Sequence, residues 1–190
     1  MTDQELTIER ALCLLPDAKR ILVMGCSGGG KSTLSMALSR RFDLPYLSMD
    51  RDFFWLPGWV KRDKREERAL IAKAVAGERW LMDGTGSSSL DLRLPRAEFV
   101  IWVRMPRWLC LYGVFRRGLK HRGGTRPEMA PGCPERMPDR EFLSYIWHFE
   151  ERVSPGIVEA LQRYAPDCPV LMLKSRGETA RLLDLIESPD

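Results

Sequence analysis

The segment "GCSGGGKST" (25–33) carries the residue types that bind the phosphate groups of a nucleotide. Gly25, Gly30, Lys31 and Ser32 match the pattern G-x-x-x-x-G-K-[ST]. Glycines let the backbone turn so that successive N–H groups face an anion at the start of a helix. Lys31 then reaches the β- and γ-phosphates, and the Ser32 hydroxyl ligates Mg²⁺. The alternative is a glycine-rich turn with a chance lysine, but an apolar run before the motif and a helical pattern after it favour phosphate binding.

The whole loop is therefore predicted to hold ATP. Its predicted nucleotide-binding residues are Gly25, Ser27, Gly28, Gly29, Gly30, Lys31, Ser32 and Thr33. Cys26 lies in the same loop, where a helix N-terminus can lower a thiol pKa. The simpler interpretation of Cys26 is a passive loop residue.

Two carboxylates follow apolar runs that read as buried strands. Asp83 ends "WLMD", as in a Walker B strand, and is predicted to support Mg²⁺ together with Ser32. Asp50 ends "PYLSMD" and is predicted to orient and deprotonate an acceptor hydroxyl. Ligands of open α/β sheets gather at the carboxyl ends of strands, which would place both acids beside the phosphate loop. The alternative for each is an aspartate that caps the next helix.

Other side chains near these acids are weaker candidates. Trp55 and Trp59 follow Asp50 and would form either a substrate platform or ordinary packing. Arg93 and Arg96 would bind an acceptor phosphate or form surface salt bridges, and Arg93 is favoured for the phosphate.

The elements that position these residues alternate along the chain. Apolar runs without polar alternation, typical of strands buried on both faces, occur at 20–25, 45–50, 79–84, 98–105 and 168–175. Helical patterns lie between them, at 32–41, 63–77, 106–119, 141–152, 154–164 and 175–186. Predicted helix starts are Asp63, Ser154 and a capping box of Ser175 with Glu178. Strands alternating with helices predict a parallel sheet in an open α/β sandwich.

Composition limits the class of protein. A chain of 190 residues with net charge +4 and no apolar run near the ~20 residues of a membrane span predicts one domain over 1–190, with no membrane partner. Residues 1–19 are predicted to form a helical extension, with Thr2 and Glu5 as a capping box. Five cysteines without metal-type spacing favour reduced thiols and a cytoplasmic location. The mild charge disfavours direct nucleic-acid binding, and the sequence predicts no oligomeric state.

The chain resembles the adenylate-kinase-like group of P-loop kinases, and within it the bacterial DNA topology modulation (FlaR-like) family. The resemblance rests on "GCSGGGKST", "DRDFFWLPGW", "RWLMDGTGSSSLDLRL", "PRWLCLYGVFRRGLKHRGGTRPEMAPGCPER" and "EFLSYIWHFEERVSPGI". It implies a P-loop NTPase three-layer α/β/α sandwich, with a five-stranded parallel sheet in order 2-3-1-4-5 and a mobile lid before the last strand. It also implies ATP-dependent phosphoryl transfer. One departure is Thr85–Gly86, where the group usually has Asn-Tyr after the Asp-Gly pair.

The lid is predicted over residues 120–140, a stretch rich in glycine, proline and arginine. Its arginines would stabilise the charge of a transferred phosphoryl group and help to exclude water. Arg116, Arg122 and Arg126 are the predicted catalytic arginines, and Arg117 is predicted to bind the nucleotide. The alternative is a solvated basic face. Cys133 and His121 are too few to ligate zinc, so no structural metal is predicted.

These residues together predict a kinase that uses ATP and Mg²⁺ and transfers the γ-phosphoryl group to a small-molecule or nucleotide acceptor. Lys31, Asp50 and Asp83 are its predicted catalytic residues beside the arginines. The alternative is an ATP-dependent regulatory NTPase associated with DNA topology, with "VKRDKREER" (60–68) as its basic segment. Because acids interleave with bases in that segment, a solvated helix face is favoured there.

Overall fold

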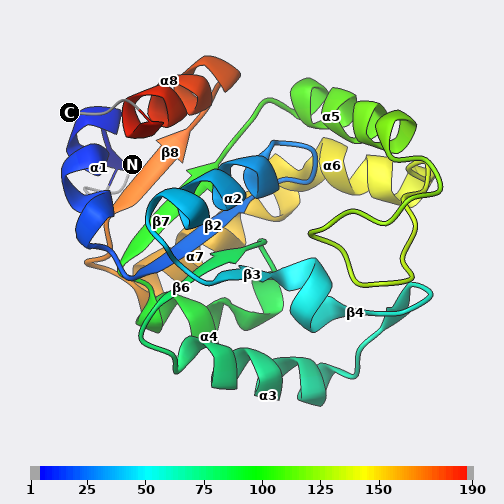
Figure 1. The fold of residues 1–190 in the computed structure, drawn as a ribbon, viewed down its shortest axis with the longest axis horizontal. Coiled ribbons are helices and arrows are strands. Elements are labelled where there is room, and N and C mark those ends of the chain that lie inside the picture. The colour runs from blue at the N-terminus through cyan, green and yellow to red at the C-terminus, as the bar shows by residue number, and fades with distance from the viewer. Residues whose placement is uncertain (1–4, 188–190) are drawn as a thin grey trace.

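The computed structural model describes residues 5–187, and a six-stranded sheet with only parallel pairs forms the centre of this part of the chain (Figure 1). The strands are β1 (Glu5–Leu6), β2 (Arg20–Gly25), β3 (Tyr46–Ser48), β6 (Trp80–Asp83), β7 (Phe99–Val103) and β8 (Val170–Leu173). Their order is β1-β8-β7-β2-β6-β3. The five predicted strands and their order 2-3-1-4-5 are confirmed, and β1 is an additional edge strand beside β8.

Burial explains why the strands lack polar alternation. Every residue of β7 and all but the first residue of β2 are buried. Strands in the middle of a parallel sheet have helices on both faces, so neither face can be polar.

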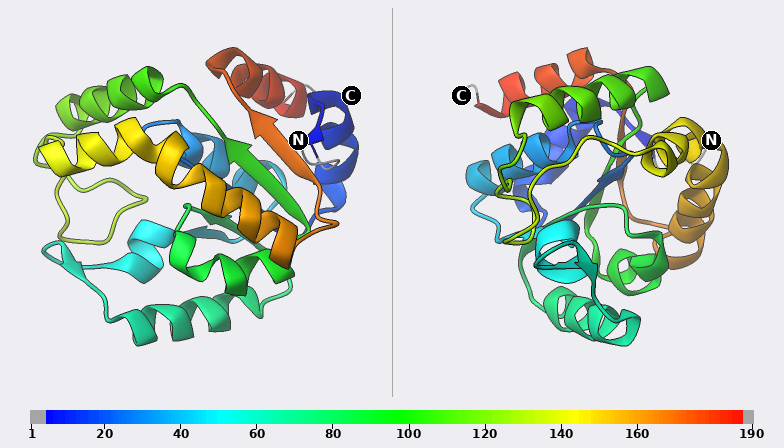
Figure 2. Two further views of the ribbon diagram at one scale, coloured as in Figure 1. Left: turned by 180° about the vertical axis from the view of Figure 1, so that it is seen from behind. Right: turned by 90° about the vertical axis from the view of Figure 1, so that its right-hand side faces the viewer.

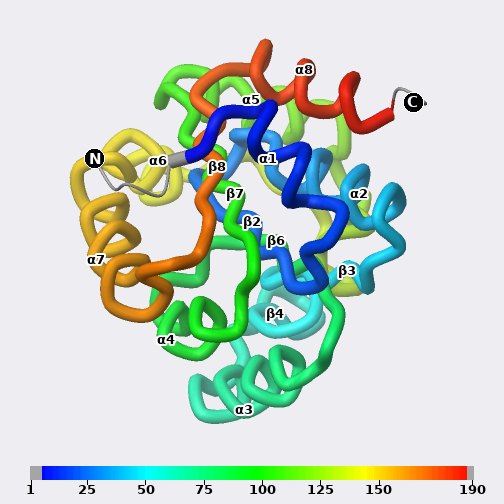
Figure 3. Tube along the Cα trace, turned by 90° about the vertical axis from the view of Figure 1, so that its left-hand side faces the viewer, coloured from blue at the N-terminus to red at the C-terminus, as the bar shows by residue number. Residues whose placement is uncertain are grey.

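Helices cover the two faces of the sheet. They are α1 (Ile8–Leu14), α2 (Lys31–Arg41), α3 (Lys64–Val75), α4 (Leu90–Arg93), α5 (Arg107–Lys120), α6 (Arg140–Arg152), α7 (Ser154–Tyr164) and α8 (Arg176–Glu187). Figure 3 shows α1, α2 and α8 on one face and α4, α6 and α7 on the other, and Figure 2 shows the same layers from two further sides. The predicted three-layer α/β/α sandwich is thus confirmed.

The predicted helix caps have mixed outcomes. Asp63 caps α3 by accepting from the N–H of Arg65 at 2.9 Å, and the Ser175 hydroxyl accepts from the N–H of Glu178 at 3.1 Å. Ser154 is not a cap, because only Val153, in helical conformation, separates α6 from α7. Ser154 is instead the first residue of α7, and its hydroxyl donates to Glu150 at 3.0 Å.

The N-terminal extension differs from the prediction. Thr2 lies outside the described residues, and Glu5 belongs to β1 rather than to a capping box. Helix α1 begins later, and its cap is Thr7, whose hydroxyl accepts from the N–H of Arg10 at 3.3 Å.

Asp50 lies beyond the end of its strand rather than at it. After β3 the chain enters one π-helical turn, η2 (Met49–Phe54). The backbone N–H of Ser48 donates to Asp52 at 2.7 Å, and the Ser48 hydroxyl accepts from the N–H of Arg51 at 3.3 Å. These local side-chain bonds compete with strand pairing and turn the chain.

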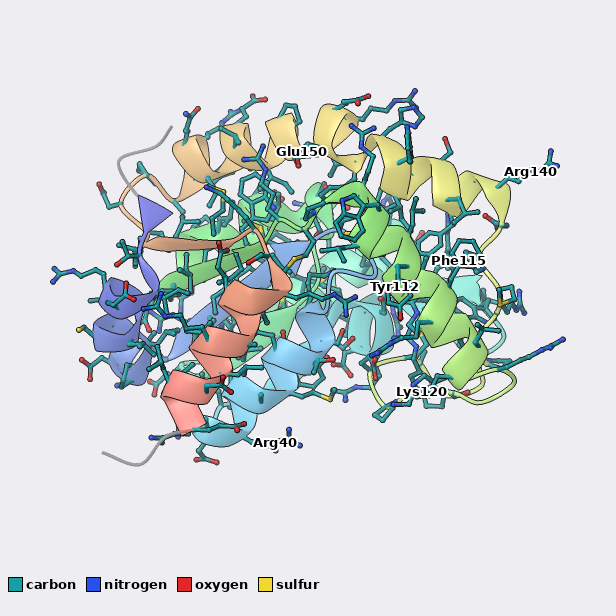
Figure 4. All side chains as sticks on the ribbon, turned by 90° about the horizontal axis from the view of Figure 1, so that it is seen from above. Arg40, Tyr112, Phe115, Lys120, Arg140 and Glu150 are labelled. Atoms are coloured by element: carbon teal, nitrogen blue, oxygen red, sulfur yellow. The ribbon has the colours of Figure 1, made fainter. Side chains whose placement is uncertain are left out.

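The predicted lid corresponds to residues 121–139, which join α5 to α6. Lys120 and Arg140, at its two ends, are labelled in Figure 4. The segment contains an isolated bridge between Arg122 and Glu135 and no named helix or strand. It lies near the antiparallel hairpin of β4 (Trp55–Leu56) and β5 (Val60–Lys61) (Figure 1). No helix within residues 5–187 has the length and apolar character needed to cross a membrane.

Candidate active site

The phosphate loop connects the carboxyl end of β2 to the start of α2. Gly28 and Gly30 adopt left-handed φ angles of +81° and +96°, which allow the tight turn. Nζ of Lys31 donates to the carbonyl oxygen of Cys26 at 2.9 Å, so the lysine folds back over the loop. Ser27 and Ser32 are half-buried, and the other predicted contacts of the loop line the same turn.

Two contacts fix this loop in place. The buried Thr85 hydroxyl accepts from the N–H of Gly25 at 2.9 Å and donates to its carbonyl at 2.7 Å. Helix α5 approaches so closely that a Cβ on Gly28 would overlap the Cys110 carbonyl, and one on Gly113 would overlap the Gly28 carbonyl. The loop is therefore held by its backbone on two sides.

Cys26 is part of this packed region. Its thiol is buried, and the contact with the Cys110 thiol together with burial raises its pKa. This environment matches the passive loop residue rather than an activated thiol.

Asp83, at the end of β6, is buried with 4% of its surface exposed. The Tyr46 hydroxyl donates to Oδ2 at 3.0 Å, whereas Oδ1 is buried without a hydrogen-bond partner. Burial raises the pKa of Asp83, Asp50 adds to this shift, and Lys31 and the hydroxyls of Ser32 and Tyr46 oppose it. A buried carboxylate oxygen without a partner, close to a serine hydroxyl, is a donor set that fits a divalent cation.

Asp50 is the point on which three cations converge. Its side chain is exposed to solvent. The many protein atoms around the carboxyl group nevertheless displace water, and this desolvation raises the pKa of Asp50. The charges of Lys31, Arg126 and Arg117 and a hydrogen bond with Trp55 oppose the shift. The three cations come from the phosphate loop, the lid and α5, so distant parts of the sequence meet at this carboxylate.

Arg126 of the lid and Arg117 of α5 are paired with acids in this structure. Nε of Arg117 and Nε of Arg126 donate to the two oxygens of Glu135, at 2.7 and 2.5 Å. Nη1 of Arg126 also donates to Glu128 at 2.8 Å. Arg126 and Glu135 are buried, whereas Arg116 and Arg122 are exposed. The structure thus brings Arg117 and Arg126 to Asp50 and leaves Arg116 and Arg122 at the surface.

The lid packs on the segment that follows Asp50. The Ser48 hydroxyl donates to the Glu128 carbonyl at 2.8 Å, and the Trp59 indole donates to the Pro134 carbonyl at 3.1 Å. Trp55 and Trp59 also pack against a small buried cluster formed by Met129, Ala130 and Cys133. The aromatic pair therefore supports the lid, as in the packing interpretation.

The prediction that Arg93 binds an acceptor phosphate is wrong. Its guanidinium is fully buried and donates to the carbonyls of Gly84 at 2.7 Å and Gly86 at 2.8 Å, and also to that of Thr85. Burial lowers the pKa of Arg93 to about 10. Arg96 donates to the Val75 carbonyl at 3.2 Å. Arg93 therefore shapes the loop after β6 from inside the protein.

Several site residues escaped the sequence analysis. Tyr46 orients Asp83, and Thr85 fixes Gly25. Glu128 and Glu135 are acids inside an arginine-rich stretch, and that mixed charge was a usable signal for ion pairing. Tyr46 and Thr85 had no such signal, because their partners are distant in sequence.

Known proteins resemble the chain in sequence or in structure. No family model matches the chain. An uncharacterized protein of Bacillus subtilis, YqaC, is 27% identical over 180 residues, covering 90% of this chain and 98% of that protein. Shikimate kinase from Acinetobacter baumannii in complex with shikimate has a TM-score of 0.54 at 13% identity, covering 88% of this chain and 90% of that one. A gluconokinase from Sinorhizobium meliloti has a TM-score of 0.49 at 14% identity, covering 88% of each chain.

The fold is thus an α/β fold that matches that of solved P-loop kinases. The relation to the FlaR-like family remains a prediction.

Proposed function

We propose that the protein is an ATP-dependent kinase that phosphorylates a small-molecule or nucleotide acceptor. The observation that carries the proposal is the convergence of Lys31, Arg117 and Arg126 on Asp50, a solvent-accessible carboxylate beside the phosphate loop. Phosphoryl transfer needs positive charge around the transferred group and an acid that accepts the hydroxyl proton.

The phosphates of ATP would lie on residues 28–33. Ser32 and Asp83 would hold Mg²⁺, which supplies positive charge to the phosphate oxygens. The adenine ring of ATP would lie near the turn before α8, where the Arg176 guanidinium lies over the Tyr112 ring at 5.7 Å.

In the proposed reaction, the acceptor hydroxyl attacks the γ-phosphoryl group beside Asp50. The oxygen of an acceptor hydroxyl forms a bond to the γ-phosphorus while the bond from that phosphorus to the β,γ-bridging oxygen breaks. The hydroxyl proton passes to the Asp50 carboxylate, and ADP leaves with the electron pair of the broken bond. The raised pKa of Asp50 suits a group that takes up a proton at neutral pH.

The decisive experiment compares Lys31→Ala with wild type in transfer of ³²P from [γ-³²P]ATP to a bacterial small-molecule extract. The variant should stay folded and lose transfer, whereas Lys120→Ala, at the exposed end of α5, should keep it. If Lys31→Ala retained phosphoryl transfer, the kinase proposal would be wrong.

The arginines near Asp50 are tested by Arg117→Ala and Arg126→Ala, with the exposed Arg122→Ala for comparison. If Arg117 and Arg126 act on the transferred group, kcat should fall much more than the affinity for ATP. Equal, small losses in both quantities would mean that these arginines do not act on the transferred group.

The DNA-associated alternative receives less support. In segment 60–68 the bases pair with acids, Arg62 with Glu66 and Lys64 with Glu67 at 3.0 Å. Paired charges of this kind do not form a continuous basic stripe for a phosphate backbone.

A kinase acting on metabolites would work in the cytoplasm, and the five free thiols agree with that location.

A further inference from the structure

We infer that the acceptor is an uncharged alcohol rather than a phosphorylated or carboxylated compound. The inference rests on the proposed function and narrows it to a substrate class. It follows from the partners of the cations that surround the acceptor side of Asp50.

Three segments surround η2, the turn that carries Asp50. The loop after β6 lies against it so closely that a Cβ on Gly84 or Gly86 would overlap the Met49 side chain. Helix α3 contacts η2 from a second side. The lid reaches it from a third, through the bond from Ser48 to the Glu128 carbonyl. An acceptor bound at Asp50 therefore meets side chains from these segments.

Arg51 of η2 and Arg93, which lies beyond the loop after β6, are already bound to protein groups. Arg51 makes a two-pronged ion pair with Asp52, at 2.8 and 2.9 Å, and donates to the Tyr46 carbonyl at 3.1 Å. Arg93 is fully buried among three backbone carbonyls. Both guanidinium groups would have to break these bonds to receive an anion.

The basic residues of α3 and of the segment just before it are likewise paired or exposed. Arg68 forms a two-pronged pair with Asp91, at 3.1 and 2.6 Å. Arg62 donates to the Phe53 carbonyl at 2.8 Å and pairs with Glu66. Lys64 pairs with Glu67 at 3.0 Å. The remaining three, Lys61, Arg65 and Lys73, are exposed to solvent, which screens a charge and weakens its hold on an anion.

The charge balance at Asp50 also disfavours an anionic acceptor. Arg117 and Arg126 are offset by Glu128 and Glu135. Lys31 faces the two remaining acids, Asp50 and Asp83. Among these named groups, four carboxylates oppose three cations before any substrate enters.

ATP and Mg²⁺ would claim the cations of the phosphate loop. A second phosphate or a carboxylate would then lie in a partly desolvated space without a dedicated cation, which is unfavourable. An alcohol needs only a hydrogen-bond acceptor for its hydroxyl, and Asp50 provides one.

The test divides the bacterial extract by charge at neutral pH, on a cation-exchange column followed by an anion-exchange column. Wild-type protein and [γ-³²P]ATP are incubated with the flow-through, which holds uncharged compounds such as nucleosides and polyols, and with the retained anions. We expect ³²P transfer with the flow-through, absent in Lys31→Ala, and retained when the extract is first treated with alkaline phosphatase and the phosphatase is then removed. Such treatment removes phosphomonoesters but leaves alcohols.

Transfer with the retained fraction alone would overturn the inference and leave the kinase proposal intact. Loss of transfer after phosphatase treatment would do the same. No transfer with either fraction or with the whole extract would overturn the proposed function, and the inference with it.

Discussion

The phosphate loop and the lid both contribute to the site at Asp50, but they are held by different forces. The loop is fixed by backbone contacts, through Thr85 on one side and Gly113 of α5 on the other. The lid is held by ion pairs centred on Glu135 and by a few apolar side chains. Backbone packing defines one geometry, whereas ion pairs can exchange one partner for another. A site that must bind and release substrate benefits from having one of each.

The largest expected effect concerns the lid. Glu135→Gln removes the charge shared by Arg117 and Arg126 and leaves the buried Arg126 guanidinium with Glu128 alone as its ion-pair partner. Breaking a buried pair costs about 3 kcal/mol or more, so amide hydrogen exchange across 121–139 should accelerate about 100-fold. Glu151→Gln, which breaks an exposed pair with Arg107, is the control. Unchanged exchange in Glu135→Gln would mean that ion pairs do not hold the lid.

The second effect concerns the loop. Gly113→Ala places a methyl group against the Gly28 carbonyl and should cost about 1–3 kcal/mol in the free energy of unfolding, with weaker ATP binding. Gly156→Ala in α7 meets open space and should be neutral or gain up to about 1 kcal/mol. Thermal unfolding and ATP titration measure both variants. Equal behaviour of the two would show that the close approach is not a constraint.

The third effect distinguishes Asp83, the buried acid beside the phosphate loop, from the ion-paired acids of the lid. Burial raises the pKa of Asp83 in the folded protein above its value in the unfolded chain. The contribution of Asp83 to the free energy of unfolding is therefore complete below the unfolded pKa and is lost as pH rises through the folded pKa. Asp83→Asn should therefore unfold at a higher temperature than wild type at neutral pH, by roughly 2–4 °C for each 1 kcal/mol.

The gap between Asp83→Asn and wild type should close as pH falls toward the unfolded value of about 4. Stabilisation by Mg²⁺–ATP should be smaller in the variant. Asp167→Asn, at an exposed position, serves as the control. A gap that stays constant with pH would contradict an unpaired buried charge at Asp83.

The smallest effect tests the neutral contacts of the lid. Trp59→Phe keeps an aromatic ring but removes the indole N–H that donates to the Pro134 carbonyl at 3.1 Å. One hydrogen bond contributes about 1 kcal/mol, so limited proteolysis within the lid should become several-fold faster. A loss as large as that of Glu135→Gln would assign the lid's stability to its neutral contacts instead.

The parts predicted from sequence are those set by local patterns. Apolar runs located five strands, Asp63 and Ser175 marked two helix starts, and the glycine-lysine motif located the phosphate loop. The order of the five strands came from the resemblance and holds in the structure. Strand β1 was missed because two residues that pair through their backbone leave no hydrophobic pattern.

The parts that could not be predicted depend on contacts between distant segments. Arg93 looked like an anion ligand because its sequence does not reveal that three carbonyls surround it. The adjacent Arg116 and Arg117 have the same chemistry, and only the packing of α5 makes one exposed and the other part of the site. The charge balance around Asp50 likewise depends on which acids meet which bases in space.

The bridge between Arg122 and Glu135 has a consequence for how the lid can vary in length. The bridge, together with the bond from the Glu135 N–H to the Gly124 carbonyl at 2.8 Å, joins the two arms of the lid at its base. The residues beyond form a closed loop, and the entropy of closing a loop rises only slowly with its length. A longer closed loop should therefore cost little by itself, whereas an insertion at the base would shift Glu135 away from both of its arginines.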